Sequence, residues 1–236
     1  MHRPFGCSSR HWRSIGNPWK RRPGWRMCSR FTLSANEPIG PLPTSHARKS
    51  WSSKHSLHHP AVHKLIKILR AEGRCKEAIP EYETVISSDP NFASAYANLG
   101  WCKFLTGSIE DAIPLEEKAL RLTPRGPFVG TLYLRIGTAH LLQSHYEDAI
   151  RWLEKARNAT PWPAEVRSHL ASAHALTGER DHAAAQLAEA RRMSPDDRYS
   201  SIARPRAAEH FGAPKIRALR EATYFAGLRV AGMPEE

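Results

Sequence analysis

The chain has 236 residues, enough for one or two domains with a buried core, and its 41% hydrophobic and 25% charged residues are typical of a globular protein. No apolar run approaches the roughly 18 to 20 residues that a membrane-spanning helix needs, which excludes a membrane-spanning protein. Its four cysteines include no C-x-x-C pair, so we expect neither a disulfide framework nor a zinc ribbon, and we expect a cytoplasmic location.

The positive charge is concentrated at the N-terminus. The formal net charge is +12, but residues 1–58 hold eleven basic side chains and one acidic side chain. Residues 59–236 hold 24 basic and 22 acidic side chains, a net charge of +2. The basic character of the whole chain therefore does not predict that its folded part binds nucleic acid.

Residues 1–58 are rich in Arg, Trp, Ser and Pro and have almost no aliphatic spacing. Such a segment buries too little apolar surface to offset the entropy lost on ordering, so we expect it to be disordered. Three interpretations of it stay open. The first is a basic arm that binds nucleic acid by stacking its tryptophans on bases. The second is a transit peptide, although prolines would interrupt the amphipathic helix that such a peptide forms. The third is that the segment is not a genuine protein sequence, because the start or the reading frame is wrongly assigned, and the abrupt change of composition near His58 favours this interpretation.

A repeat of about 34 residues organises the remainder of the chain. Prolines end four predicted helices at intervals of 34, 37 and 34 residues, at Pro90, Pro124, Pro161 and Pro195. An alanine lies twelve residues before each proline, at Ala78, Ala112, Ala149 and Ala183. The predicted turns contain Gly73, Gly107 and Gly178, with Ser144 in the place of the fourth glycine. This period is typical of helix-turn-helix solenoids.

Each residue type in the repeat has a physical role. The alanines allow the two helices of a hairpin to approach closely, the glycine supplies a left-handed turn, and the proline ends the second helix. Apolar residues at three- and four-residue steps on both sides of the helices predict that each hairpin is buried between two neighbours. We therefore predict an all-α fold of stacked antiparallel hairpins.

The pattern of Tyr96, Leu99, Gly100, Ala112, Ala119 and Pro124 resembles the tetratricopeptide repeat, and the resemblance extends over residues 59–195. It implies a right-handed superhelical solenoid of about four hairpins, at 59–92, 93–129, 130–163 and 164–197, with capping helices at 198–236. The strings at 77–86, 98–113 and 224–236 also resemble the C-terminal repeat region of bacterial class III adenylate/guanylate cyclases. This narrower resemblance implies a regulatory fragment rather than the enzyme.

The C-terminal part is predicted to contain two helices. Residues 198–210 form a helix interrupted at Pro205, and a second helix begins at Pro214. Its apolar stripe, which we expect to cap the open face of the fourth repeat, is Ile216, Leu219, Ala222, Ala226 and Val230. The basic residues expected to face water are Lys215, Arg217, Arg220 and Arg229.

No catalytic or cofactor site is predicted. The sequence has no G-x-x-x-x-G-K-[ST] or G-x-G-x-x-G motif, and no stretch matches the paired metal-binding aspartates of class III cyclases. The histidines of residues 55–63 are interrupted by Pro60 and lack a carboxylate or cysteine partner, so we expect no metal there. His140 and His174 occupy equivalent repeat positions and are interpreted as packing or groove residues rather than general bases.

We predict a non-catalytic protein-interaction module that binds a protein or peptide in its concave groove and needs no cofactor. The resemblance implies that the groove is lined by the first helix of each repeat, at Lys67, Arg70, Ala97, Trp101, Phe104, Leu134, Thr138, Leu141, Ser168 and Ser172. Trp101 and Phe104 are the expected anchors for a partner, unless both rings pack on the neighbouring helix. The alternatives are a regulatory fragment of a cyclase and a nucleic-acid binder acting through the basic arm. The sequence does not identify the partner or the oligomeric state.

Overall fold

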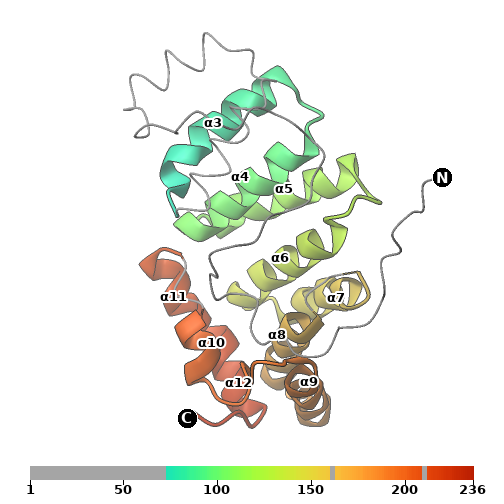
Figure 1. Cartoon of the computed structure of the whole chain (residues 1–236), viewed down its shortest axis with the longest axis vertical. Helices are drawn as coiled ribbons and strands as arrows, with labels where there is room; N and C mark the ends of the chain where they lie inside the picture. The colour runs from blue at the N-terminus through green and yellow to red at the C-terminus, as the bar shows by residue number, and fades with distance from the viewer. Residues whose placement is uncertain (1–72, 160–162, 209–211) are drawn as a thin grey trace, which may run out of the picture. The chain divides into compact units, whose positions relative to one another are not determined.

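The structure of the protein is a computed structural model that describes residues 73–159, 163–208 and 212–236 (Figure 1). These residues form helices, and no β-strand occurs among them. The repeat helices are α3 (Cys75–Ser88), α4 (Ala93–Thr106), α5 (Ile109–Leu122), α6 (Val129–Leu142), α7 (Tyr146–Arg157), α8 (Pro163–Leu176) and α9 (Arg180–Met193). The helices after them are α10 (Ala203–Ala208), α11 (Pro214–Arg220), the π-helical turn η1 (Glu221–Phe225) and α12 (Ala226–Val230). The predicted all-α fold is confirmed.

The repeat helices pack in chain order as hairpins. Helix α4 packs on α5, α6 on α7 and α8 on α9, while α3 packs on α4, α5 on α6 and α7 on α8 between hairpins. Helices α3, α5 and α9 each end two residues before a proline, as the repeat predicted. Among the described helices, none has the length and apolar character needed to cross a bilayer. The predicted disordered segment and the first helix of the first repeat lie outside the described residues.

The turn after the first helix of each hairpin is left-handed, as predicted. Gly107 and Gly178 have φ values of +100° and +86°. Ser144 holds the equivalent position between α6 and α7 and has φ +62°, so the chain keeps this turn where glycine is replaced.

Close helix contacts explain the small residues of the repeat. A Cβ atom at Gly137 would lie 2.7 Å from Leu153 Cγ on the paired helix, and one at Gly100 would lie 3.1 Å from the Ala112 carbonyl oxygen. Ala149, on α7, is completely buried. A larger side chain at these positions would separate the two helices of the hairpin.

We expect Ala149→Trp to lower the free energy of unfolding by about 1–3 kcal/mol, because overpacking a filled core forces helices apart. The matched control is Ala184→Trp, which places the same ring at an exposed position of α9. Thermal melts followed by circular dichroism compare the two. Equal melting temperatures for both variants would contradict the hairpin packing.

The first C-terminal helix differs from the prediction. Helix α10 begins at Ala203, not at residue 198, and Pro205 lies in its first turn. A proline is tolerated there because the first-turn N–H groups have no acceptor within the helix. The prediction that Pro205 interrupts a longer helix is therefore wrong.

The buried face of the second C-terminal helix was also predicted incorrectly. The helix begins at Pro214 as expected, and Ile216 is buried, but Ala222 is exposed and Val230 is 50% exposed. The π-helical turn η1 adds one residue to the helical turn and so rotates every later residue by one position. From η1 onward the buried residues are Thr223, Tyr224, Phe225, Gly227 and Leu228.

Candidate functional site

The first helices of the repeats, α4, α6 and α8, form what we name the A-helix face. Residues 214–230, which comprise α11, η1 and α12 and are named the C-terminal segment, lie along it (Figure 1). Helix α11 contacts α4 and α6, η1 contacts α6 and α8, and α12 contacts α8. The segment was predicted to cap the open face of the fourth repeat. It does contact α8 of that repeat, through η1 and α12, and it also extends along α6 and α4 of the two preceding repeats.

The C-terminal segment approaches the A-helix face closely at Gly227. A Cβ atom on this residue would lie 2.2 Å from Ser172 Oγ, 2.5 Å from the Ser172 carbonyl oxygen and 2.8 Å from Ser172 Cα. Two of these atoms belong to the backbone of α8, so no side-chain rotation could make room. Only glycine allows α12 to lie this close to α8.

One helical turn earlier, Tyr224 anchors the C-terminal segment. Its hydroxyl group is 2.9 Å from Ser168 Oγ, and its ring stacks on His169 with 4.4 Å between ring centroids. Burial lowers the pKa of His169 to about 3, so the imidazole is neutral at physiological pH. Its Nδ1–H donates to the Glu165 carbonyl oxygen at 2.8 Å, which orients the ring beneath Tyr224. This contact thus joins two aromatic rings and a buried hydrogen bond.

A charged contact lies beside this pair of rings. Arg220 was predicted to face water, yet its guanidinium Nε and Nη1 atoms are buried. Burial lowers the pKa of Arg220, and the Glu165 carboxylate and Tyr224 act in the opposite sense. Burial raises the pKa of Glu165. The segment therefore buries a positive charge near an acidic residue of α8.

The A-helix face holds most of the predicted groove residues, but they are not open to solvent. Six of them are buried, namely Phe104, Leu134, Thr138, Leu141, Ser168 and Ser172. Phe104 shares an apolar cluster with Ile216, and Leu134 and Leu141 share another with Tyr224, Phe225 and Leu228. Ala97 and Trp101 are partly exposed, while Lys67 and Arg70 lie outside the described residues.

Trp101 and Phe104 differ in their surroundings. Their rings stack with 5.1 Å between centroids, but Phe104 is only 2% exposed and is a core residue. The Arg135 guanidinium also lies over the Trp101 ring, 4.6 Å from its centroid. Trp101 also lines a hollow of about 700 Å³ with Leu105 and residues 73–77. Of the two predicted anchors, Phe104 is buried in this structure and Trp101 is partly exposed.

Trp101→Ala should cost about 1–2 kcal/mol of stability, because it removes one aromatic stack and one partly desolvated cation–π contact. Phe104→Ala should cost more, since it leaves a cavity in the core. Chemical denaturation of both variants measures the difference. A larger loss for Trp101→Ala than for Phe104→Ala would contradict the burial of Phe104.

Sequence reasoning missed Tyr224, Gly227 and the burial of Arg220. Two signals were present: a glycine inside a helix, which often marks a close backbone contact, and the spacing of three residues between Tyr224 and Gly227. The π-helical turn has no recognised signature in a single sequence, so the helix face could not be assigned correctly beyond residue 220.

Comparisons with known proteins agree with this geometry. The tetratricopeptide repeat family model matches residues 63–127. The fold is similar to that of MamA, with 22% identity over 70% of this chain and 92% of that one and a TM-score of 0.52. It is also similar to MamA from Desulfovibrio magneticus RS-1, with 16% identity over 72% and 93% of the two chains and a TM-score of 0.54.

A third solved structure with this fold is YrrB, described as a tetratricopeptide repeat protein with an unusual peptide-binding site. The identity is 18%, over 78% of this chain and 95% of that one, and the TM-score is 0.54. No curated protein matches the sequence. The matched repeat region and the stacked hairpins together identify this chain as a protein with the tetratricopeptide repeat fold.

Proposed function

We propose that the protein is a non-catalytic interaction scaffold whose A-helix face binds an amphipathic helix, and that its own C-terminal segment is the resident helix. The observation that carries this proposal is the contact of α11, η1 and α12 with α4, α6 and α8. A partner helix would bind the same surface, the A-helix face, by displacing the C-terminal segment. YrrB, which shares the fold, is described as having a peptide-binding site, and this supports the same use of the fold here.

The contacts of the C-terminal segment indicate which helix would be recognised. Ser172 admits only a residue without a side chain at the position of Gly227, and Ser168 and His169 accept an aromatic hydroxyl three residues earlier. An arginine near Glu165 adds a charged contact. We therefore propose a partner helix with the pattern Arg-x-x-x-Tyr-x-x-Gly on its apolar side.

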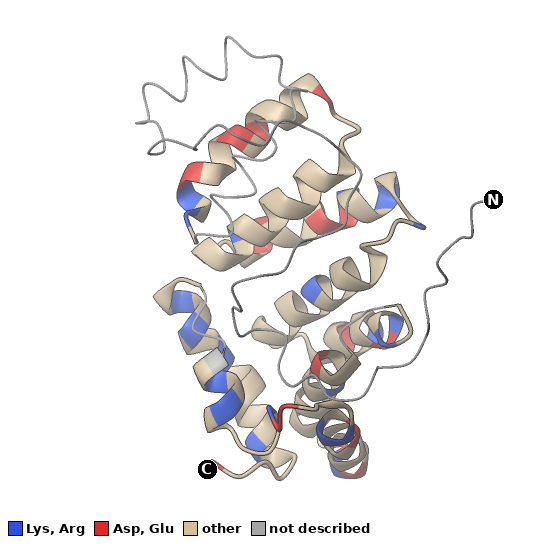
Figure 2. Cartoon of the chain, viewed as in Figure 1, with Lys and Arg blue, Asp and Glu red and all other residues tan. Residues whose placement is uncertain are grey.

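The C-terminal helices carry an excess of basic residues. Figure 2 shows Lys and Arg positions, coloured blue on the ribbon, gathered on α10, α11 and α12. They include Lys215, Arg217 and Arg220 on α11, against a single acidic residue, Glu221, between residues 212 and 230. Lys215 and Arg217 are exposed, so of these three only Arg220, whose guanidinium atoms are buried, contributes to recognition by the A-helix face.

A second candidate is regulation of a nucleotide cyclase, which rests on the resemblance of residues 77–86, 98–113 and 224–236 to the repeat region of those enzymes. Translation of the DNA upstream of His58 in all frames tests it, because a cyclase domain in another frame would support the candidate. The basic arm on which nucleic-acid binding depends lies outside the described residues.

A synthetic peptide supplied in trans tests helix binding. A fluorescent peptide of residues 213–233 is titrated against the full chain and against the full chain with Gly227→Ala, and its anisotropy is measured. We expect saturable binding of the peptide to the variant, because its own C-terminal segment is displaced. Binding to the unmodified chain should be at least about tenfold weaker, because its A-helix face is already occupied by that segment.

The matched control peptide carries Gly227→Ala itself and should not bind either chain. If the unmodified peptide fails to bind the Gly227→Ala chain while that chain keeps its helical circular dichroism, the A-helix face is not a site for exchangeable helices.

A further inference from the structure

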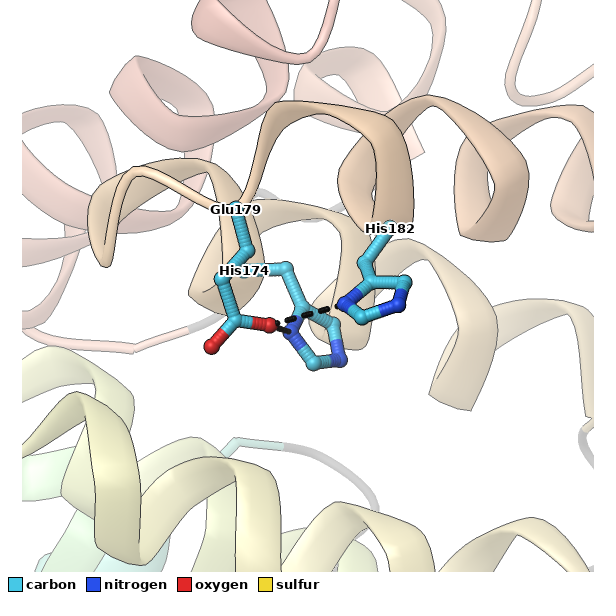
Figure 3. A group of neighbouring side chains, drawn as sticks. All are labelled: His174, Glu179 and His182. Carbon is cyan, nitrogen blue, oxygen red and sulfur yellow. Dashed lines mark hydrogen bonds and ion pairs between the residues drawn. The ribbon is translucent and has the colours of Figure 1, made fainter.

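A cluster of two imidazoles and a carboxylate lies at the turn between α8 and α9, away from the contacts of the C-terminal segment described above (Figure 3). His174 comes from the last turn of α8, Glu179 from the connecting turn and His182 from the first turn of α9. Both Nδ1 atoms face the same oxygen: Glu179 Oε2 is 2.8 Å from His174 Nδ1 and 3.0 Å from His182 Nδ1. The three ligand atoms lie within 4.8 Å of one another.

The backbone fixes the positions of these residues. The Glu179 N–H donates to the His174 carbonyl oxygen at 2.9 Å, and the Ala183 N–H donates to the Glu179 carbonyl oxygen at 2.9 Å. Gly178, with φ +86°, closes the turn between them. The side chain of His174 is largely buried, whereas Glu179 and His182 are exposed and free to adjust. One ligand is therefore held in place and two can move toward it.

We propose that His174 Nδ1, Glu179 Oε2 and His182 Nδ1 form a binding site for a zinc ion. Two imidazole nitrogens and one carboxylate oxygen are a ligand set that zinc accepts, with water in the remaining position. Ligand atoms at about 2.0–2.2 Å from a tetrahedral zinc lie about 3.4 Å apart. The two N–O separations of 2.8 and 3.0 Å need to open by only about half an ångström, which the exposed side chains allow.

Binding exchanges hydrogen bonds for coordination. In the metal-free state each Nδ1–H donates to the carboxylate. Each imidazole must move its proton to Nε2, or lose it to solvent if it is protonated, so that the Nδ1 lone pair faces the ion. The zinc ion then links the end of α8 to the start of α9 and closes the fourth hairpin.

The preceding hairpin provides an internal comparison. Its equivalent positions also hold two histidines and a carboxylate, His140, His145 and Asp148. There, however, the carboxylate of Asp148 is paired with Arg151. Ala185 occupies the place of Arg151 in the fourth repeat, so no arginine at that position competes for Glu179.

Zinc titration of the full chain tests the site. Zn²⁺ binding is measured by isothermal titration calorimetry in excess Mg²⁺ for the unmodified chain, His182→Gln and Glu179→Gln. Because the chain has 13 histidines and four cysteines, the informative quantity is the difference between variants. We expect His182→Gln to lose one equivalent of zinc, and Glu179→Gln to bind that equivalent at least about tenfold more weakly.

The matched control is His145→Gln, which removes an exposed histidine from the preceding turn and should leave zinc binding unchanged. As a second readout, zinc should raise the melting temperature of the unmodified chain and of His145→Gln more than that of His182→Gln. Equal zinc stoichiometry and affinity in the unmodified chain and His182→Gln would overturn the proposal, since the cluster would then be a hydrogen-bonded turn only.

Discussion

Replacing Gly227 by alanine is expected to detach the C-terminal segment and to lower the free energy of unfolding by about 3 kcal/mol or more. The new methyl group would lie 2.2–2.8 Å from atoms of Ser172, including its backbone carbonyl oxygen. Overpacking usually costs about 1–3 kcal/mol, and a backbone contact this short lies at the upper end. Helix propensity acts in the opposite direction, because alanine stabilises a helix by about 1 kcal/mol relative to glycine.

The sign of the change therefore distinguishes the docked helix from a free one. If the segment did not lie against α8, Gly227→Ala would stabilise the protein. Chemical denaturation gives the stability, and amide hydrogen exchange of residues 214–230 reports detachment directly. Ala222→Leu is the control, since it adds a larger side chain to an exposed position of the same segment and should leave both measurements nearly unchanged.

This prediction depends on structure that the sequence could not supply. The repeat of prolines, alanines and glycines predicted the hairpins, because the close contacts at Ala112 and Ala149 impose the same residue in every copy. The site is different, because the C-terminal segment occurs once and has no repeated pattern. Its position depends on one glycine and one π-helical turn, whose effects are visible only when α12 is placed against α8.

The groove residues are a second case in which the sequence predicts the position of a residue but not its burial. Family positions placed Ser168 and Ser172 on the A-helix face, and the structure has them there, in contact with Tyr224 and Gly227. Burial of those residues follows from a segment more than 40 residues later in the chain, so no local pattern could reveal that the face is covered. In the same way, the partnership of Glu116 with Arg135 joins two hairpins and has no signature in either one.

Glu116 is a buried carboxylate whose lost hydration is only partly replaced by contacts with the protein. It lies on α5 with a side chain that is 4% exposed, and its Oε1 is 3.4 Å from Arg135 Nη1. Its Oε2 has no hydrogen-bond partner among the residues that the structure describes. Arg135 also donates to the Ala97 carbonyl oxygen and lies over the ring of Trp101, so its charge is shared among several contacts. Burial raises the pKa of Glu116 to about 7, although the nearby arginine acts in the opposite sense.

We expect this carboxylate to make the protein less stable as the pH rises from about 4.5 to about 7. The unfolded chain loses the Glu116 proton near its ordinary pKa of 4.5, whereas the folded chain keeps it until about 7. Within this window the folded state binds more protons than the unfolded state, so the free energy of unfolding falls as the pH increases. The shift corresponds to a loss of about 3 kcal/mol, complete above pH 7.

Glu116→Gln removes this titration while it keeps the shape of the side chain. Urea denaturation of both proteins between pH 4.5 and 8 gives their difference in stability, in which all other titrating groups cancel. As the pH rises from 4.5 to about 7, the free energy of unfolding of the variant should increase by about 3 kcal/mol relative to that of the unmodified protein. Glu110→Gln, at an exposed position of the same helix, should stay within about 0.5 kcal/mol of the unmodified protein at every pH. Parallel stability curves for Glu116→Gln and the unmodified protein would mean that water reaches the Glu116 carboxylate, and that Arg135 holds it as a solvated ion pair.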